Sequence, residues 1–131
     1  MRLINLTPHD IHIVREDGTV FTVPRDPDAV IPRVPLETLV VGELSVNGRA
    51  IPVRKSYQAA PVAPLPPRIA GVIYIVSRAT AEAAPDRPDL VYPDDAVRDE
   101  AGRVIGCRAL GTAVEDWDEA IRRLWSERGD S

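Results

Sequence analysis

The chain has 131 residues, of which 44% are hydrophobic and 27% charged, and its formal net charge is −4. This composition predicts one soluble globular domain and excludes a disordered chain. The acidic balance argues against binding to a nucleic-acid polymer, no apolar run reaches the about 18 residues of a membrane helix, and a single cysteine excludes a disulfide framework. We therefore expect a cytoplasmic protein without a membrane partner.

The N-terminal half has the pattern of short β-strands separated by turns. Asp17-Gly18 and Asn47-Gly48 are typical reverse-turn pairs, and the second, flanked by apolar residues, is the strongest hairpin signal in the chain. Four prolines between residues 24 and 35 predict a surface loop, and the proline-dense segment 59–68 predicts a stiff extended connector. The predicted strands are residues 3–6, 11–14, 19–23, 36–41, 44–46 and 49–51.

The second half begins with the most hydrophobic strand. Residues 72–76 form a continuous apolar, β-branched run, which predicts a strand buried on both faces. Ser77 is placed to cap a short helix over residues 79–84, which Pro85 ends. Residues 97–99 and 103–108 then predict a second hairpin around a turn that contains Gly102.

The last predicted element is an amphipathic helix. Thr112 and Glu115 have the spacing of a capping box, and Gly129 is a plausible stop. The residues on its apolar face are Val114, Trp117, Ile121, Leu124 and Trp125. The spacing leaves open whether the tryptophans pack on their own domain or on another subunit.

The fold class expected from these elements is α+β. Residues 1–110 form a β-rich core domain of antiparallel hairpins, with a short helix after the central strand. Residues 111–131 form a C-terminal amphipathic helix appended to that domain.

The sequence contains no catalytic motif that we can identify. His9 and His12 are the only histidines, and no cysteine or carboxylate pattern beside them predicts a metal site. Cys107 lies within a predicted strand, which favours a buried, inert thiol over a nucleophile. We expect a non-enzymatic protein with no catalytic residue, cofactor or metal.

One pattern predicts an anion site. Fifteen of the sixteen basic residues are arginines, which indicates either the codon bias of a GC-rich genome or guanidinium forks for phosphate. A buried strand that ends in Ser77-Arg78 and opens a helix offers free N–H groups beside a guanidinium. The alternative is that Ser77 only caps the helix, while the arginines pair with Asp86, Asp89 and Asp99 on the surface. The candidate ligand-binding residues are Ser77, Arg78, Arg98, Arg103 and Arg108, with Asn5, Thr7 and His9 as a second wall.

These residues lead to two hypotheses about function. The first is a protein that binds a small phosphate-bearing ligand, such as a nucleotide-derived signal. The alternative is a protein-interaction or regulatory module that acts through the face of Trp117 and Trp125. The same helix could join copies of the chain in a homo-oligomer.

Several motifs together resemble a family of small, uncharacterised proteins of actinobacteria and their phages. The resemblance covers roughly residues 3–110, and a heavier proline segment and the tryptophan-bearing helix depart from it. The motifs are Ile4–His9, Gly71–Ser77, Ala81–Pro85 with Arg87 and Asp89-Leu90, and Val97–Leu110. By analogy with compact phage proteins, the resemblance implies a sponge that sequesters a nucleotide signal of bacterial immunity.

Overall fold

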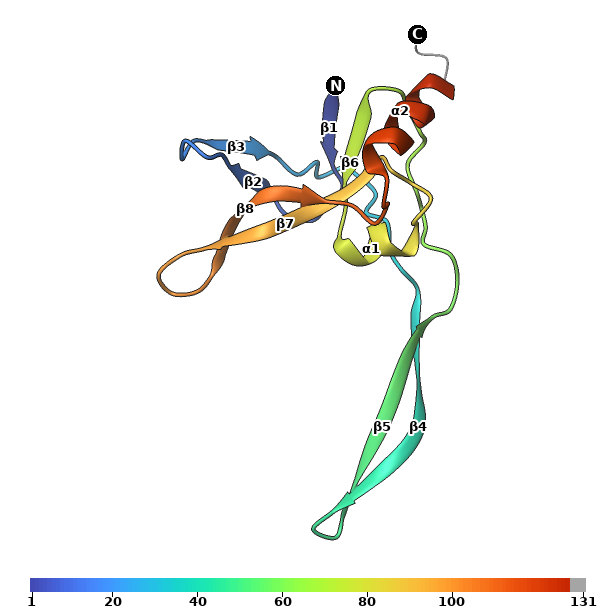
Figure 1. Cartoon of the computed structure of the whole chain (residues 1–131). Helices are drawn as coiled ribbons and strands as arrows, with labels where there is room; N and C mark the ends of the chain where they lie inside the picture. Colours follow the sequence, from blue (N-terminus) through green and yellow to red (C-terminus); the bar gives the residue numbers. More distant parts are fainter. Residues whose placement is uncertain (128–131) are drawn as a thin grey trace.

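The computed structural model describes residues 1–127 and combines a six-stranded sheet, a long two-stranded arm and two helices (Figure 1). The strands are β1 (Arg2–Asn5), β2 (Ile11–Val14), β3 (Val20–Val23), β4 (Leu36–Val46), β5 (Arg49–Gln58), β6 (Val72–Ile75), β7 (Leu90–Arg98) and β8 (Val104–Gly111). The helices are α1 (Arg78–Ala83) and α2 (Trp117–Glu127). The predicted α+β class is confirmed. None of the helices described is long and apolar enough to cross a membrane.

The main sheet is mixed, in the order β1-β6-β7-β8-β2-β3. The predicted hairpins β2–β3 and β7–β8 are antiparallel, but β1–β6, β6–β7 and β2–β8 pair in parallel. At one point the edge strands β1 and β3 are linked, because the Asn5 side chain donates to the carbonyl of Val23 over 3.0 Å. The sheet therefore curls until its two edges approach.

Strand β6 is buried on both faces, as predicted. Val72 and Tyr74 pack in a cluster that includes residues of α1, whereas Ile73 and Ile75 pack in a second cluster that includes Ile121 of α2. Ser77 caps α1, since its hydroxyl accepts a hydrogen bond from the Thr80 amide at 3.2 Å. The core thus lies on the two sides of β6.

Helix α2 packs against the protein's own sheet. Trp117, Leu124 and Trp125 are partly buried beside Ile121, and the Trp117 indole donates to the carbonyl of Pro88 over 2.7 Å. This answers the question that the spacing left open: within this chain, the tryptophans cover their own core.

The predicted start of this helix is wrong. α2 begins at Trp117, and the Ala120 amide bonds to the carbonyl of Asp116, so no capping box forms at Thr112. The Thr112 hydroxyl instead accepts from the Val114 amide at 3.1 Å and closes a local turn. The predicted stop at Gly129 lies outside the described residues.

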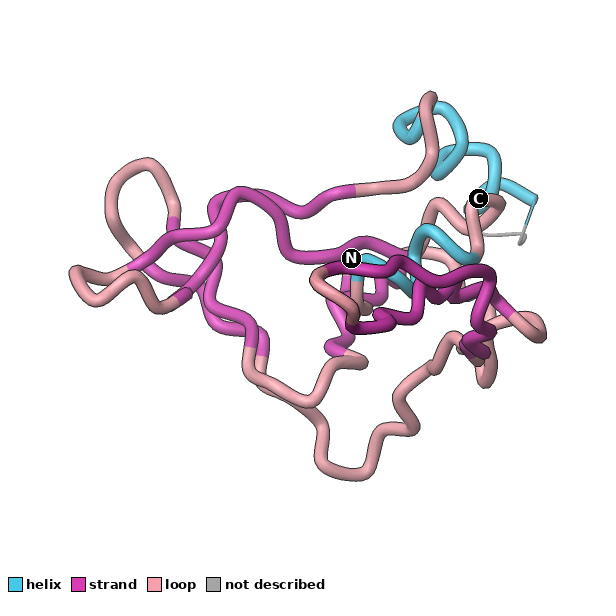
Figure 2. Tube along the Cα trace, turned by 90° about the horizontal axis from the view of Figure 1, so that it is seen from below, coloured by secondary structure: helices cyan, strands magenta, loops and turns pink. Residues whose placement is uncertain are grey.

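Strands β4 and β5 form an arm that projects from the rest of the molecule (Figure 1), and Figure 2 shows the structure from below, the side to which the arm points. The predicted turn is present, with positive φ at Asn47 and Gly48, but the strands run on to Gln58, well past the predicted end. Every residue of both strands is exposed.

Candidate functional site

The carboxyl ends of the parallel strands β1 and β6 lie together at one edge of the sheet, beside β7. Asn5 pairs with Ile75, and Ile75 pairs with Val91, so β1 and β6 end side by side against β7. The chain continues this register for one more step, because the amides of Leu6 and Val76 bond to the carbonyls of Ile75 and Val91, each at 2.8 Å. Ligands of open sheets with parallel strands commonly bind outside such strand ends.

Two of the predicted walls meet at this edge. The turn of Thr7 and His9 follows β1, Ser77 and Arg78 follow β6, and Pro93 lies at the same level on β7. Strand β7 continues past the point where its neighbour β6 ends. We call this group of five residues, Thr7, His9, Ser77, Arg78 and Pro93, the edge site.

Asn5 and Thr7 hold the turn that precedes β2. The buried Asn5 carboxamide oxygen accepts from the Thr7 amide at 2.9 Å and from the Thr7 hydroxyl at 2.7 Å. Its nitrogen donates to the carbonyls of His9 and Val23, at 2.7 and 3.0 Å. Because these bonds occupy the Asn5 side chain, Asn5 and Thr7 position His9 rather than offering free groups to a ligand.

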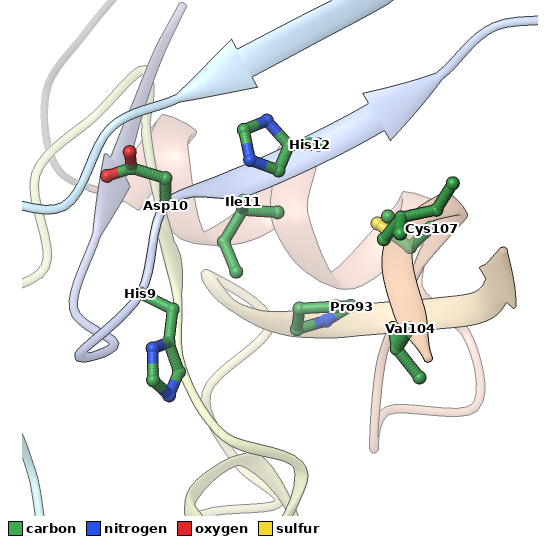
Figure 3. A pocket seen from close by; sticks show the side chains of 9 residues that line it. His9, Asp10, Ile11, His12, Pro93, Val104 and Cys107 are labelled. Carbon is green, nitrogen blue, oxygen red and sulfur yellow. The ribbon is translucent and has the colours of Figure 1, made fainter. Parts of the chain in front are cut away.

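A pocket of about 530 Å³ opens beside His9. Figure 3 shows His9, Asp10, Ile11 and His12 around the start of β2, Pro93 on β7, and Val104 and Cys107 on β8. Its volume lies within the range of about 300–1,000 Å³ that small-molecule sites occupy. His9 and His12 both contribute to the lining of this pocket, because His9 belongs to the turn before β2 and not to the strand that carries His12.

Ser77 and Arg78 differ in how many of their hydrogen-bonding groups remain free to bind a ligand. The Ser77 hydroxyl also donates to the Thr80 hydroxyl over 2.9 Å, so its single proton is already used and cannot be donated to an anion. Arg78 donates through Nε to Glu82 over 2.6 Å, and its guanidinium carbon lies 5.4 Å from the centre of the Tyr92 ring. The hydrogen bond to Glu82 raises the pKa of Arg78.

The terminal nitrogens of Arg78 make no hydrogen bond within residues 1–127, so they can still donate to a ligand. Helix α1 has only six residues, so we assign no anion-binding role to its dipole.

The three hairpin arginines are not gathered around Ser77. Arg98 donates to the Gly102 carbonyl over 2.8 Å, and Arg103 pairs with Asp99 at 3.3 Å, so both lie at the turn of the β7–β8 hairpin. Arg98 is five residues beyond Pro93, roughly 16 Å along an extended strand. Arg108 lies on β8 between the level of Pro93 and the hairpin turn, and it faces Asp95 at 3.7 Å. The Arg103–Asp99 pair matches the surface-pairing alternative. Arg108 pairs instead with Asp95, which that alternative did not name, and Asp89 is buried rather than on the surface.

Cys107 is buried among the residues that line the pocket, as predicted. Burial raises the pKa of its thiol and keeps it protonated, which is the opposite of what a nucleophilic cysteine needs. Residues 1–127 contain no group of three or more histidine, cysteine or carboxylate side chains arranged to hold a metal ion.

The prediction missed Pro93, Tyr92 and the role of His12. The only local signal was that Tyr92 and Pro93 follow the apolar pair Leu90-Val91. Comparison with known proteins gave no match to a family model, to a curated protein or to a solved structure.

Proposed function

We propose that this chain is a non-enzymatic, cytoplasmic protein that binds a small phosphate-bearing ligand at the edge site. The observation that carries the proposal is that His9 and Arg78 follow the ends of two neighbouring parallel strands, β1 and β6, and that a pocket of ligand size lies beside His9. Guanidinium groups form strong, charge-assisted hydrogen bonds with phosphate oxygens.

The pocket supports a ligand that also has an apolar or aromatic part. Ile11, Pro93 and Val104 supply apolar surface and His9 supplies polar ring nitrogens, whereas Nδ1 of His12, which also lines the pocket, already makes a hydrogen bond of 2.9 Å with Thr22 Oγ1. This mixture suits a nucleotide, with its base against the apolar wall and its phosphate toward the strand ends. The resemblance to phage proteins extends the proposal to a sponge that sequesters a nucleotide-derived signal.

The alternative of a protein-interaction module acting through Trp117 and Trp125 is disfavoured by the packing of α2. The Trp117 indole is bonded to Pro88, and both rings lie against the second core cluster, so this face is already covered.

Isothermal titration tests the proposal. The probes are nucleoside mono- and diphosphates, cyclic dinucleotides, inorganic phosphate and adenosine, which carries no phosphate. We expect at least one nucleotide to bind more tightly than adenosine, and we expect Arg78→Ala and His9→Ala each to weaken it about tenfold or more, since a hydrogen bond to a charged group contributes about 1.5–3 kcal/mol.

Arg103→Ala is the matched control, because it removes a guanidinium at the hairpin turn. It should leave the affinity unchanged. Absence of nucleotide binding, or a loss caused by Arg103→Ala and not by Arg78→Ala, would contradict the assignment. Native mass spectrometry of the purified protein would in addition give the mass of any retained ligand.

A further inference from the structure

The arm formed by β4 and β5 has two unlike faces. Residues paired across two strands lie on the same face of a sheet, so the register assigns each side chain to a face. One face, which we call the opposite face, is mixed: it carries Thr38 and Ser56, whose hydroxyls lie 2.9 Å apart, and the charged residues Glu43 and Arg54. Its apolar residues are Leu36, Val40, Ala50 and Pro52. The other, which we call the apolar face, contains Leu39, Leu44, Val46, Ile51, Val53 and Tyr57.

Nothing in residues 1–127 covers the apolar face. Its six apolar side chains are between 38% (Val53) and 56% (Leu44) exposed. A two-stranded hairpin by itself is at best marginally stable in water, and a contiguous exposed apolar patch marks an interaction site. The arm therefore needs a partner both to stay ordered and to bury these side chains.

The base of the arm is fixed to the body. Arg33 and Ala63 exchange backbone hydrogen bonds of 3.0 and 3.1 Å, and Ala59 donates to the carbonyl of Pro35 over 2.9 Å. Val62, which follows the arm, is buried in the first core cluster. Because both connections are held, the arm projects in a defined direction, and its partner must come from outside the chain.

The charges on the apolar face point to a second copy of this chain. Glu37 lies on this face near the base, paired with Tyr57, and Arg49 lies on it at the tip, paired with Val46. A third charge, Lys55, lies between them, paired with Leu39, and in an antiparallel packing it faces the apolar pair Leu44 and Ile51 of the other copy rather than a second Lys55. We propose that two copies pack these faces together with their arms antiparallel, so that Glu37 of each chain lies opposite Arg49 of the other. A parallel arrangement would instead place like charges together, which is unfavourable.

The size of the apolar face determines how tightly we expect two copies to associate. The strands have 11 and 10 residues, and alternate side chains point to one face, so each arm offers about ten residues. A standard interface uses about 20–30 residues on each side. We therefore expect a reversible dimer with a dissociation constant in the micromolar range. This inference does not depend on the proposed ligand.

Sedimentation velocity on the full chain, from about 1 to 500 μM, tests the interface. Leu44→Asp places a charge on the apolar face, and Val40→Asp is the matched control because Val40 is 62% exposed on the opposite face. We expect Leu44→Asp to raise the dissociation constant at least tenfold and Val40→Asp to change it little. A monomer at every concentration, or equal effects of the two variants, would overturn the proposal. Circular dichroism confirms that each variant is folded.

Charge reversal tests the antiparallel orientation. Glu37→Arg and Arg49→Glu should each weaken self-association about threefold, since exposed ion pairs contribute little. An equimolar mixture of the two variants should associate as well as the unmodified chain, because both contacts between unlike chains then join opposite charges. A mixture that associates no better than either variant alone would overturn the antiparallel arrangement.

Discussion

Asp89 is fully buried, and Arg87 donates to both of its carboxylate oxygens, each over 2.8 Å. The same guanidinium donates to the carbonyl of Pro66 over 2.8 Å, and the Tyr74 hydroxyl donates to the next carbonyl, that of Pro67, over 2.7 Å. These bonds attach the proline-rich segment that leaves the arm to the loop before β7, through Arg87, and to β6, through Tyr74. The pair therefore links the arm to the sheet that carries the edge site.

We expect Arg87→Ala to lower the free energy of unfolding by about 3–5 kcal/mol, because it leaves the Asp89 carboxylate buried without its partner. Urea denaturation followed by circular dichroism measures the loss. Arg123→Ala is the control, since its pair with Glu119 at 3.0 Å is exposed on α2 and should contribute less than about 1 kcal/mol. Similar losses in both variants would show that burial of the Arg87 pair does not matter.

Gly111→Ala should disturb the edge site indirectly, through the Tyr92 ring. A Cβ atom at Gly111 would lie 2.4 Å from the Tyr92 ring, the ring on which Arg78 stacks. Overpacking of this kind costs about 1–3 kcal/mol. The shifted ring should also move Arg78 and weaken nucleotide binding.

Gly42→Ala is the control for this substitution, because its Cβ would meet no atom within 4 Å. Thermal unfolding and titration calorimetry give the two readouts. If Gly111→Ala changes neither the unfolding temperature nor the nucleotide affinity, the Tyr92 ring moves aside without cost.

The sequence predicted those parts of the fold that depend on neighbouring residues. The turns at Asp17-Gly18, Asn47-Gly48 and Gly102 identified all three hairpins, because positive φ is a local requirement. The parallel pairing of Asn5 with Ile75 joins residues 70 positions apart, and no local signal specifies it. The arm was unpredictable for a similar reason: its apolar residues look like those of any half-buried strand, and only the tertiary structure leaves them uncovered.

The candidate site was predicted only where it depends on neighbouring residues. Ser77 was identified as a cap from its position after an apolar run, and the structure confirms that role. Whether Arg78 and Arg98 share a site depends on how far β7 extends past the sheet edge, which the residue pattern does not determine. The arginines are close in sequence, but Arg98, Arg103 and Arg108 do not gather around Ser77 in the structure.

Cys107 should react slowly with a thiol reagent in the native protein. Its thiol is buried, and burial raises its pKa, so little thiolate is available at neutral pH. Labelling with 5,5′-dithiobis(2-nitrobenzoic acid) at pH 7.5 should be slow without denaturant and complete in 6 M guanidinium chloride. Rapid stoichiometric labelling of the folded chain would contradict this prediction and show that the Cys107 thiol is accessible to the reagent from the pocket beside His9.

Tryptophan emission should be blue-shifted and independent of protein concentration. Trp117 and Trp125 pack beside Ile121 on the chain's own sheet, and the proposed dimer contact lies on the arm, away from α2. Dimerisation should therefore leave both rings in the same surroundings. The comparison is made between about 1 and 100 μM, across the micromolar range expected for the dimer.

Ile121→Ala supplies the positive control for this measurement. Truncation of this buried isoleucine should lower the free energy of unfolding by about 2–5 kcal/mol and weaken the packing of α2 against the sheet. The tryptophans then become more exposed, so their emission should shift to the red. If the unmodified protein emits at the wavelength of exposed tryptophan when dilute and shifts to the blue only when concentrated, α2 rather than the arm forms the contact between copies.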